Sequence, residues 1–264
     1  MKMPGSLYKS VMASLNQGGH GGPPHQYPSQ KPRMRMAPEM EGKARGKDRF
    51  TKELTALQTR LMELAHLAAD ALEKSVRALL WRDADLARQV IAGDAAVNSL
   101  EEAIDRECVH LIALFQPVAG DLRKLMAVAR IITELERIGD SATNIAEEVL
   151  TIVQLPPRAI HPQLEFMAQS VQEMVRHSLE AYSRSNAHLA RQVCLADDDI
   201  DALDRAIIQD LLTEMAGAPR AIVPSQSQIN IVRNLERVGD HATNIAEQVV
   251  YMVEGESIRH RCQG

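Results

Sequence analysis

Carboxylate side chains recur at matched positions in two nearly identical stretches of this 264-residue chain. Residues 135–149 read LERIGDSATNIAEEV and residues 235–249 read LERVGDHATNIAEQV, with twelve of fifteen positions identical. In each copy a Glu is followed four residues later by an Asp and four later by an Asn, which forms one stripe on a helix. The stripes are Glu136, Asp140 and Asn144, and Glu236, Asp240 and Asn244.

Both stripes contain residues that destabilise a helix. Two like charges four residues apart repel each other by a few tenths of a kcal/mol. Each copy also has a glycine within the stripe, Gly139 and Gly239, which costs about 1 kcal/mol relative to alanine. Because the same choices occur twice, we expect a compensating gain, such as a bound cation beside closely packed backbone.

A further acidic stripe precedes each copy and supplies the partners of a metal site. The segment LARQV occurs at 86–90 and again at 189–193, so the two stripes occupy equivalent positions. If the stripes of one repeat face each other, four to six oxygen ligands converge, as hard cations or iron require. The candidate metal ligands are Asp94, Asn98, Glu136, Asp140, Asp197, Asp201, Glu236 and Asp240, with Glu101, Asp105, Asn144 and Asn244 as possible additions and Asp204 beside the second set.

These residues do not match three common types of metal site. A ferritin-like di-iron site needs Glu-x-x-His pairs, which neither copy has. An EF-hand calcium loop and a zinc site with Cys or His at ligand spacing are also missing. One alternative stays open: Arg137 and Arg237 each precede an Asp by three residues, so the stripes could be surface salt bridges.

Composition limits the function classes. The net charge is −5, but residues 1–49 hold nine Lys or Arg and three Asp or Glu, which leaves −11 on the rest. An acidic body argues against nucleic-acid binding. No Gly-rich phosphate loop, nucleophile elbow or Cys/His pair is present, so no catalytic residue is predicted. Scattered cysteines and no apolar run of membrane length favour a cytoplasmic protein.

The elements that must position these residues are helices. Few aromatic residues and apolar residues spaced three and four apart predict an all-α chain. Glycine and proline mark the expected breaks, with Gly93 as a reversal and Asp94 as the following N-cap. The expected helices are 51–92, 95–115, 121–153, 161–196, a shorter helix after Asp197 that is equivalent to 95–115, and about 225–254. A linker is expected at 154–162, with Gly255 as a C-cap.

The predicted architecture is therefore two tandem three-helix bundles related by internal duplication. The first bundle spans residues 50–155 and the second 163–256, after a disordered leader at 1–49 that is rich in Gly and Pro. Whether the bundles pack side by side or end to end stays open.

The duplicated unit, with ERIGDSATNIAE and ERVGDHATNIAE, resembles the PhoU family. VIAGDAAVNSLEEAID at 90–105 and QPVAGDLRKL at 116–125 are also similar to that family's first repeat, and the resemblance covers about residues 50–260. It implies a cytoplasmic, non-enzymatic accessory protein of phosphate-specific transport. Its partners would be the ATPase of a phosphate ABC transporter and a sensor histidine kinase, with membrane contact only through them.

The resemblance also implies a homodimer and multinuclear iron or zinc clusters held by E/D-xxx-D motifs. These motifs fall on Glu136/Asp140 and Glu236/Asp240, with Asp197/Asp201 as the second partner. The first partner is weaker because Asp94 is followed by Asn98. Two rival functions are a metal-storage or metal-dependent phosphatase protein and, less favoured, a DNA-binding regulator.

Overall fold

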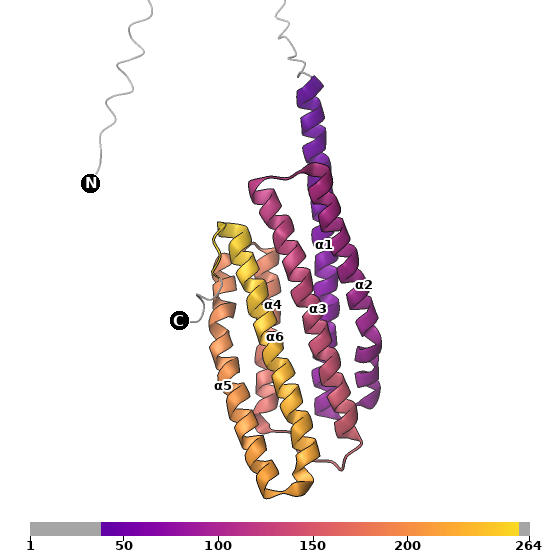
Figure 1. Cartoon of the computed structure of the whole chain (residues 1–264), viewed down its shortest axis with the longest axis vertical. Coiled ribbons are helices and arrows are strands. Elements are labelled where there is room, and N and C mark those ends of the chain that lie inside the picture. The colour runs from indigo at the N-terminus through magenta and orange to yellow at the C-terminus, as the bar shows by residue number, and fades with distance from the viewer. Residues whose placement is uncertain (1–37, 259–264) are drawn as a thin grey trace, which may run out of the picture. The chain divides into compact units, whose positions relative to one another are not determined.

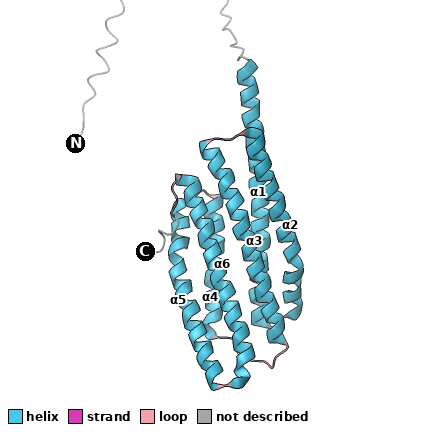
Figure 2. Cartoon of the chain, in the orientation of Figure 1, coloured by secondary structure: helices cyan, strands magenta, loops and turns pink. Residues whose placement is uncertain are grey.

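The structure is a computed structural model that describes residues 38–258, with side chains from Gly46 onward. Within these residues every regular element is a helix and no strand occurs (Figures 1 and 2). The expectation of an all-α fold is confirmed. The elements are α1 (Pro38–Trp81), α2 (Ala84–Phe115), α3 (Ala119–Val153), α4 (Pro162–Ser183), α5 (Ala187–Gly217), the short 3-10 helix η1 (Pro219–Ala221) and α6 (Ile222–Glu254).

The helices form two bundles of three that lie side by side. α2 packs on α3, α3 on α6, and α6 on α5, so these four helices make one layer (Figure 1). α4 packs against both α5 and α6, and α1 lies beside α4 behind the layer. The fully buried core contains Leu57, Leu61, Ile104, Leu135 and Ile138, so the apolar stripes meet as the sequence predicts.

The first helical reversal lies eleven residues earlier than the glycine predicted to mark it. α1 ends at Trp81, Arg82 adopts a left-handed φ of 53°, and the Asp83 carboxylate accepts hydrogen bonds from the backbone N of Asp85 and Leu86. Gly93 lies inside α2, where no atom comes within 4 Å of an added Cβ. The predicted break at Gly93 and the predicted N-cap at Asp94 are therefore wrong, because a side-chain cap outweighs one exposed glycine.

The same correction applies to the second repeat. The predicted helix 161–196 is two helices, since α4 ends at Ser183 and α5 begins at Ala187. Ser185 has a φ of 50° and Asn186 caps α5 by accepting from the backbone N of Leu189, as Arg82 and Asp83 do in the first repeat.

Three further boundaries can be compared with the sequence predictions. α3 begins at Ala119 with Val118 at the N-cap position, so Asp121 lies in the first turn rather than at the cap. α6 ends at Glu254 and Gly255 has a φ of 79°, as predicted for a glycine C-cap. A leader was predicted at 1–49. Its residues 1–37 lie outside the described part of the chain, and its residues 38–49 belong to α1.

The linker between α3 and α4 is held at both ends. The guanidinium of Arg82 donates to the carbonyls of Ile152 and Leu155 at 2.9 and 2.8 Å, which satisfies the C-terminal end of α3. Further along, Arg158 pairs with Glu214, and the backbone N of His161 donates to Gln228 at 2.7 Å. The linker therefore docks on the second bundle.

Hydrogen bonds across α3 and α6 show how the two bundles are related. Each pair joins one residue from α3 to one from α6, and the partners run in opposite directions along the two helices. The pairs are Arg130 with Gln248, Glu134 with Asn244, Asn144 with Asn234, and Glu148 with Asn230. With the repeat offset of one hundred residues, the first pair is equivalent to the fourth and the second to the third. A local twofold axis therefore passes between α3 and α6 at the level of Gly139 and Gly239.

Candidate metal sites on two carboxylate ladders

The first carboxylate ladder joins α2 to α3. It comprises Asp94, Asn98, Glu101 and Asp105 on α2 with Glu136 and Asp140 on α3. The Asn98 amide donates to Asp94 Oδ2 at 3.0 Å, and the Thr143 hydroxyl donates to Asp94 Oδ1 at 3.4 Å. The structure therefore places Asp94 near Glu136 and Asp140, whose pKa values its charge raises, while hydroxyl and amide groups hold its own carboxylate.

The second carboxylate ladder occupies the equivalent place between α5 and α6. It comprises Asp197, Asp201 and Asp204 on α5 with Glu236 and Asp240 on α6. The Thr243 hydroxyl donates to Asp197 Oδ1 at 3.4 Å, which repeats the bond from Thr143 to Asp94. The two ladders differ mainly where Asp201 replaces Asn98 and where Ile208 replaces Asp105, so each ladder has five carboxylates in a different arrangement.

The pKa values show that the carboxylates of each ladder interact. Burial, followed by the charges of Asp240 and Asp204, raises the pKa of Glu236 to about 7. Burial and the charge of Asp240 raise the pKa of Asp197 to about 6. In the first ladder, burial and nearby carboxylates raise the pKa of Glu136 and of Asp140 above their ordinary values. Uncompensated negative charge thus collects at both ladders.

The salt-bridge reading of these stripes can be compared with the geometry. Arg137 pairs at 3.6 Å with Glu134, three residues before it, and not with the predicted partner Asp140, three residues after it. Within the described residues, no salt bridge joins Arg137 to Asp140 or Arg237 to Asp240. The charge of Arg237 does lower the pKa values of Asp140 and Asp240, though it does not offset burial and like charge.

The two motif glycines are explained by helix packing. A Cβ added to Gly139 would lie 3.1 Å from Val97 Cγ1, and one added to Gly239 would lie 3.5 Å from Ile200 Cγ2. Each glycine lets a β-branched residue of the neighbouring helix approach the backbone closely. The compensation expected for these glycines is therefore close packing of α2 on α3 and of α5 on α6, without any need for a cation.

The donor chemistry of the ladders fits an oxygen-bound cation, but the side chains do not enclose one as they stand. Asn98 Oδ1 and Asp204 Oδ1 are buried acceptors with no hydrogen-bond partner in the described chain. Among the described residues, no group of three or more His, Cys, Asp or Glu side chains stands close enough to hold an ion. Binding would therefore require side chains of a ladder to rotate toward one another.

The asparagines of the repeated motif point into the seam between the bundles. The amide of Asn144 donates to Asn234 Oδ1 at 3.3 Å, and that of Asn244 donates to Glu134 Oε2 at 3.1 Å. Both side chains are thus engaged across α3 and α6, away from the partners predicted for them on the ladders.

Sequence reasoning missed the strongest polar contact of this seam. His241 Nδ1 lies 2.8 Å from Glu134 Oε2, and both side chains are largely buried. Hydrogen bonds from His241 and Asn244 lower the pKa of Glu134 against the opposing effect of burial. The sequence did contain a signal for this contact. The two repeats match closely, but Ser141 stands where the second repeat has His241, and Asn234 stands where the first has Glu134. The two threonines that bond the ladders lie in the identical ATNIAE segment, a further signal that went unused.

The duplicated arrangement matches one known domain family in both bundles. The PhoU domain model matches residues 61–149 and again residues 164–249, so both bundles fit the same family model. The chain belongs to the PhoU family. Its resemblance to that family and the two-bundle PhoU-like fold are thereby confirmed.

Curated relatives and solved structures agree with this assignment. The chain is 37% identical over 213 residues to the phosphate-specific transport system accessory protein PhoU homolog of Pseudomonas putida, covering 80% of this chain and 83% of that protein. The Aquifex aeolicus homolog is 37% identical over 210 residues, covering 80% and 95%. The crystal structure of PhoU from Pseudomonas aeruginosa superposes with a TM-score of 0.76 at 36% identity, covering 78% of this chain and all of that one. The phosphate transport system regulatory protein PhoU from Streptococcus pneumoniae gives 0.74 at 30% identity, covering 79% and 98%.

Two remaining sequence expectations concern the membrane and the cysteines. None of the described helices has the length and apolar character needed to span a bilayer. Cys108 and Cys194 are buried and form no disulfide within the described residues, and burial raises the pKa of Cys108 to about 12. Cys262 lies outside the described residues.

Proposed function

We propose that this protein is a non-enzymatic, cytoplasmic accessory protein of phosphate-specific transport that represses the phosphate-starvation response. Its partners would be the ATPase of the phosphate ABC transporter and a sensor histidine kinase, whose signalling follows the state of the transporter. Membership of the PhoU family carries this proposal, together with relatives named as accessory and regulatory proteins of phosphate transport.

The geometry supports a binding role better than a catalytic one. The polar residues of the ladders are carboxylates, two threonines and amides on rigid helices. The threonine hydroxyls bond carboxylates at 3.4 Å, and the described ladders contain no Ser, Cys, Lys or His side chain. The protein would act by presenting charged faces to its partners, as a homodimer, and without contact with nucleic acid.

We further propose that each ladder holds iron or zinc in a multinuclear cluster. Glu136, Asp140 and Asp94 would supply the ligands of the first ladder. Asp197, Asp201, Glu236 and Asp240 would supply those of the second, where the fuller carboxylate set favours tighter binding. The bound cations would neutralise the charge that now raises the carboxylate pKa values, and so would make metal binding favourable.

A gene deletion tests the regulatory proposal. A strain lacking this gene should express a phosphate-starvation reporter in phosphate-rich medium, and the intact gene supplied in trans should restore repression. Co-purification of the tagged protein with the transporter ATPase and with the kinase measures the partner contacts separately. Normal repression in the deletion strain would remove the regulatory role.

Metal analysis of protein purified without chelators tests the ladders. Asp140→Asn should lower the metal content of the first ladder and Asp240→Asn that of the second, while circular dichroism stays unchanged. Asp199→Asn, on a different face of α5, is the matched control and should retain the metal. A phosphatase assay on the same samples separates a metal-binding regulator from the rival metal-dependent hydrolase, which requires metal-linked turnover.

A further inference from the structure

An apolar groove runs along the outer side of the second bundle, between α4 and α5. Its volume is about 770 Å³, and its floor includes the buried side chains of Met174, Val193 and Ile200. Phe166 stands on its wall with 60% of its surface exposed, an unusual position for a phenylalanine. None of the ladder residues Asp197 and Asp201 lines it, so this groove is a separate surface.

The rim of this groove carries negative charge without a counterion. Among the described residues, Glu173 from α4 and Asp199 from α5 are the two acidic side chains that line it, and no Lys or Arg does. Within the described chain, neither carboxylate takes part in a hydrogen bond or salt bridge. An apolar floor between two free carboxylates is a surface with a defined electrostatic complement.

The first repeat provides an internal comparison, because residues 61–92 correspond to 164–195 at an offset of 103. Phe166 corresponds to Glu63, so the exposed ring replaces a carboxylate. In the first bundle, Arg60 of α1 bridges to Glu107 of α2 at 2.5 Å across the equivalent position. Gln163 takes the place of Arg60 in the second bundle, and Asp210, the equivalent of Glu107, instead lies 3.3 Å from Nε2 of His161, the N-cap residue of α4.

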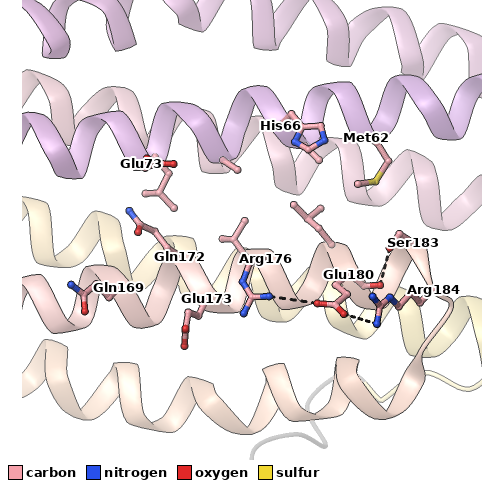
Figure 3. A pocket seen from close by; sticks show the side chains of 15 residues that line it. Met62, His66, Glu73, Gln169, Gln172, Glu173, Arg176, Glu180, Ser183 and Arg184 are labelled. Atoms are coloured by element: carbon pink, nitrogen blue, oxygen red, sulfur yellow. Dashed lines mark hydrogen bonds and ion pairs between the residues drawn. The ribbon is translucent and has the colours of Figure 1, made fainter.

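A second groove, between α1 and α4, illustrates a surface without these properties. It has a volume of about 720 Å³, and Glu180 on its wall bonds both Arg176 and Arg184 (Figure 3). Its lining includes both arginines and carboxylates, and Glu173 lines this groove as well as the α4–α5 groove, so its mixed charges select no class of partner. The groove between α4 and α5 therefore carries the inference.

We propose that the α4–α5 groove binds a basic amphipathic helix of a partner protein. The apolar face of that helix packs on Met174, Val193 and Ile200 beside the Phe166 ring. Its Lys or Arg residues pair with Glu173 and Asp199 at the two rims. The lining of α4 from Gln163 to His177 spans about 21 Å, which matches a bound helix of about four turns. The proposal is independent of the regulatory and metal proposals above.

Fluorescence anisotropy with a defined peptide tests the groove. The probe is a labelled amphipathic helix of about 18 residues with leucine on one face and lysine on the other. The control peptide has glutamate at every lysine position. The lysine peptide should bind the wild-type chain at physiological ionic strength with saturation at one site, and the glutamate peptide should not.

Matched variants separate groove binding from general attraction to an acidic protein. Phe166→Glu, which restores the first-repeat residue at an exposed site, should weaken binding by about tenfold. Glu173→Lys should weaken it several-fold, whereas Asp70→Lys, the same charge change at the equivalent first-repeat position, should have less than about a twofold effect. Thermal melts confirm that all variants remain folded.

Three results would overturn the proposal. Equal binding by Phe166→Glu and wild type would place the peptide elsewhere. Equal effects of Glu173→Lys and Asp70→Lys would reduce the attraction to net charge. Conversion of a wild-type dimer to monomer by Phe166→Glu, measured by sedimentation, would assign the groove to a second copy of this chain.

Discussion

Gly139 and Gly239 occupy the same place in the two repeats, but their surroundings differ by a few tenths of an ångström. A Cβ at Gly139 would meet Val97 at 3.1 Å, which is closer than ordinary contact. At Gly239 the contacts with Ile200 and Asp197 would be 3.5 and 3.7 Å. The glycines thus have a structural role that a sequence cannot distinguish from a role in metal binding.

This difference predicts opposite effects of the same substitution. Gly239→Ala should stabilise the protein by up to about 1 kcal/mol, because it gains helix propensity without a clash. Gly139→Ala should destabilise it by about 1 kcal/mol, because forced displacement of Val97 exceeds that gain. Urea unfolding of both variants measures the two values. Stabilisation of both to the same extent would show that the α2–α3 contact relaxes freely.

The raised carboxylate pKa values predict a pH dependence for metal-free protein. Glu236 and Asp197 ordinarily titrate near 4.5 and 3.8, but in the folded chain they titrate near 7 and 6. The folded state therefore binds more protons than the unfolded state between these values, and stability falls as pH rises from about 4 to 7. Thermal melts of chelator-treated protein should show the midpoint decreasing over this window.

Glu236→Gln is the control for this pH effect. Because glutamine has no charge to repel Asp240, the variant should lose part of the decrease and should be more stable than wild type at pH 8. An unchanged slope would mean that other groups dominate the titration.

At the scale of elements, the α3–α6 seam contains equivalent hydrogen bonds made by different residue types in the two repeats. The pair of Glu134 with Asn244 is equivalent to the pair of Asn234 with Asn144, but only the first includes a charge and a buried histidine. The two hydrogen bonds should therefore contribute unequally to stability.

Alanine substitutions at the two equivalent positions measure this inequality. Glu134→Ala should destabilise the protein by about 2–3 kcal/mol, because it removes charged hydrogen bonds and leaves His241 without its partner. Asn234→Ala should cost about 1 kcal/mol, as expected for one neutral hydrogen bond. Chemical unfolding of both variants at pH 7 gives the comparison. Equal losses would mean that the carboxylate of Glu134 and its contact with His241 add nothing to the seam.

Sequence periodicity was sufficient to predict the six-helix duplication, but it placed two turns wrongly. The apolar spacing continues through Trp81–Ala84 without a break. The turn depends on the Asp83 cap and on the left-handed backbone of Arg82, and apolar spacing predicts neither of them. The ladders were predictable because identical carboxylates recur in register. The seam was not, because hydrogen bonds such as that of Glu134 with Asn244 depend on packing between distant segments.

At the scale of the molecule, the seam should make the two bundles unfold together. α3 and α6 bury residues along nearly their whole length, including Leu135, Ala142, Leu235 and Ala242, and they contact each other along the seam. Separation of the bundles would expose this surface to water, so we expect strong coupling.

Trp81, the single tryptophan, reports on the first bundle alone. Ile207→Ala, a fully buried substitution in α5 of the second bundle, should destabilise the protein by about 2–5 kcal/mol. If the bundles are coupled, it lowers the Trp81 fluorescence midpoint as much as the circular-dichroism midpoint. A Trp81 midpoint that stays at the wild-type value would show independent unfolding.

The local twofold axis determines what a flat partner surface meets when it approaches the layer formed by α2, α3, α6 and α5. Rotation about an axis normal to this layer exchanges α2 with α5 and α3 with α6, so both ladders emerge on the same side of the protein. A partner that itself has two equal halves could therefore engage them simultaneously, one half of the partner on each ladder. Such a partner would contact Asn98 and Asp105 on one side and Asp201 and Ile208 on the other, and these differences would determine the direction in which it binds.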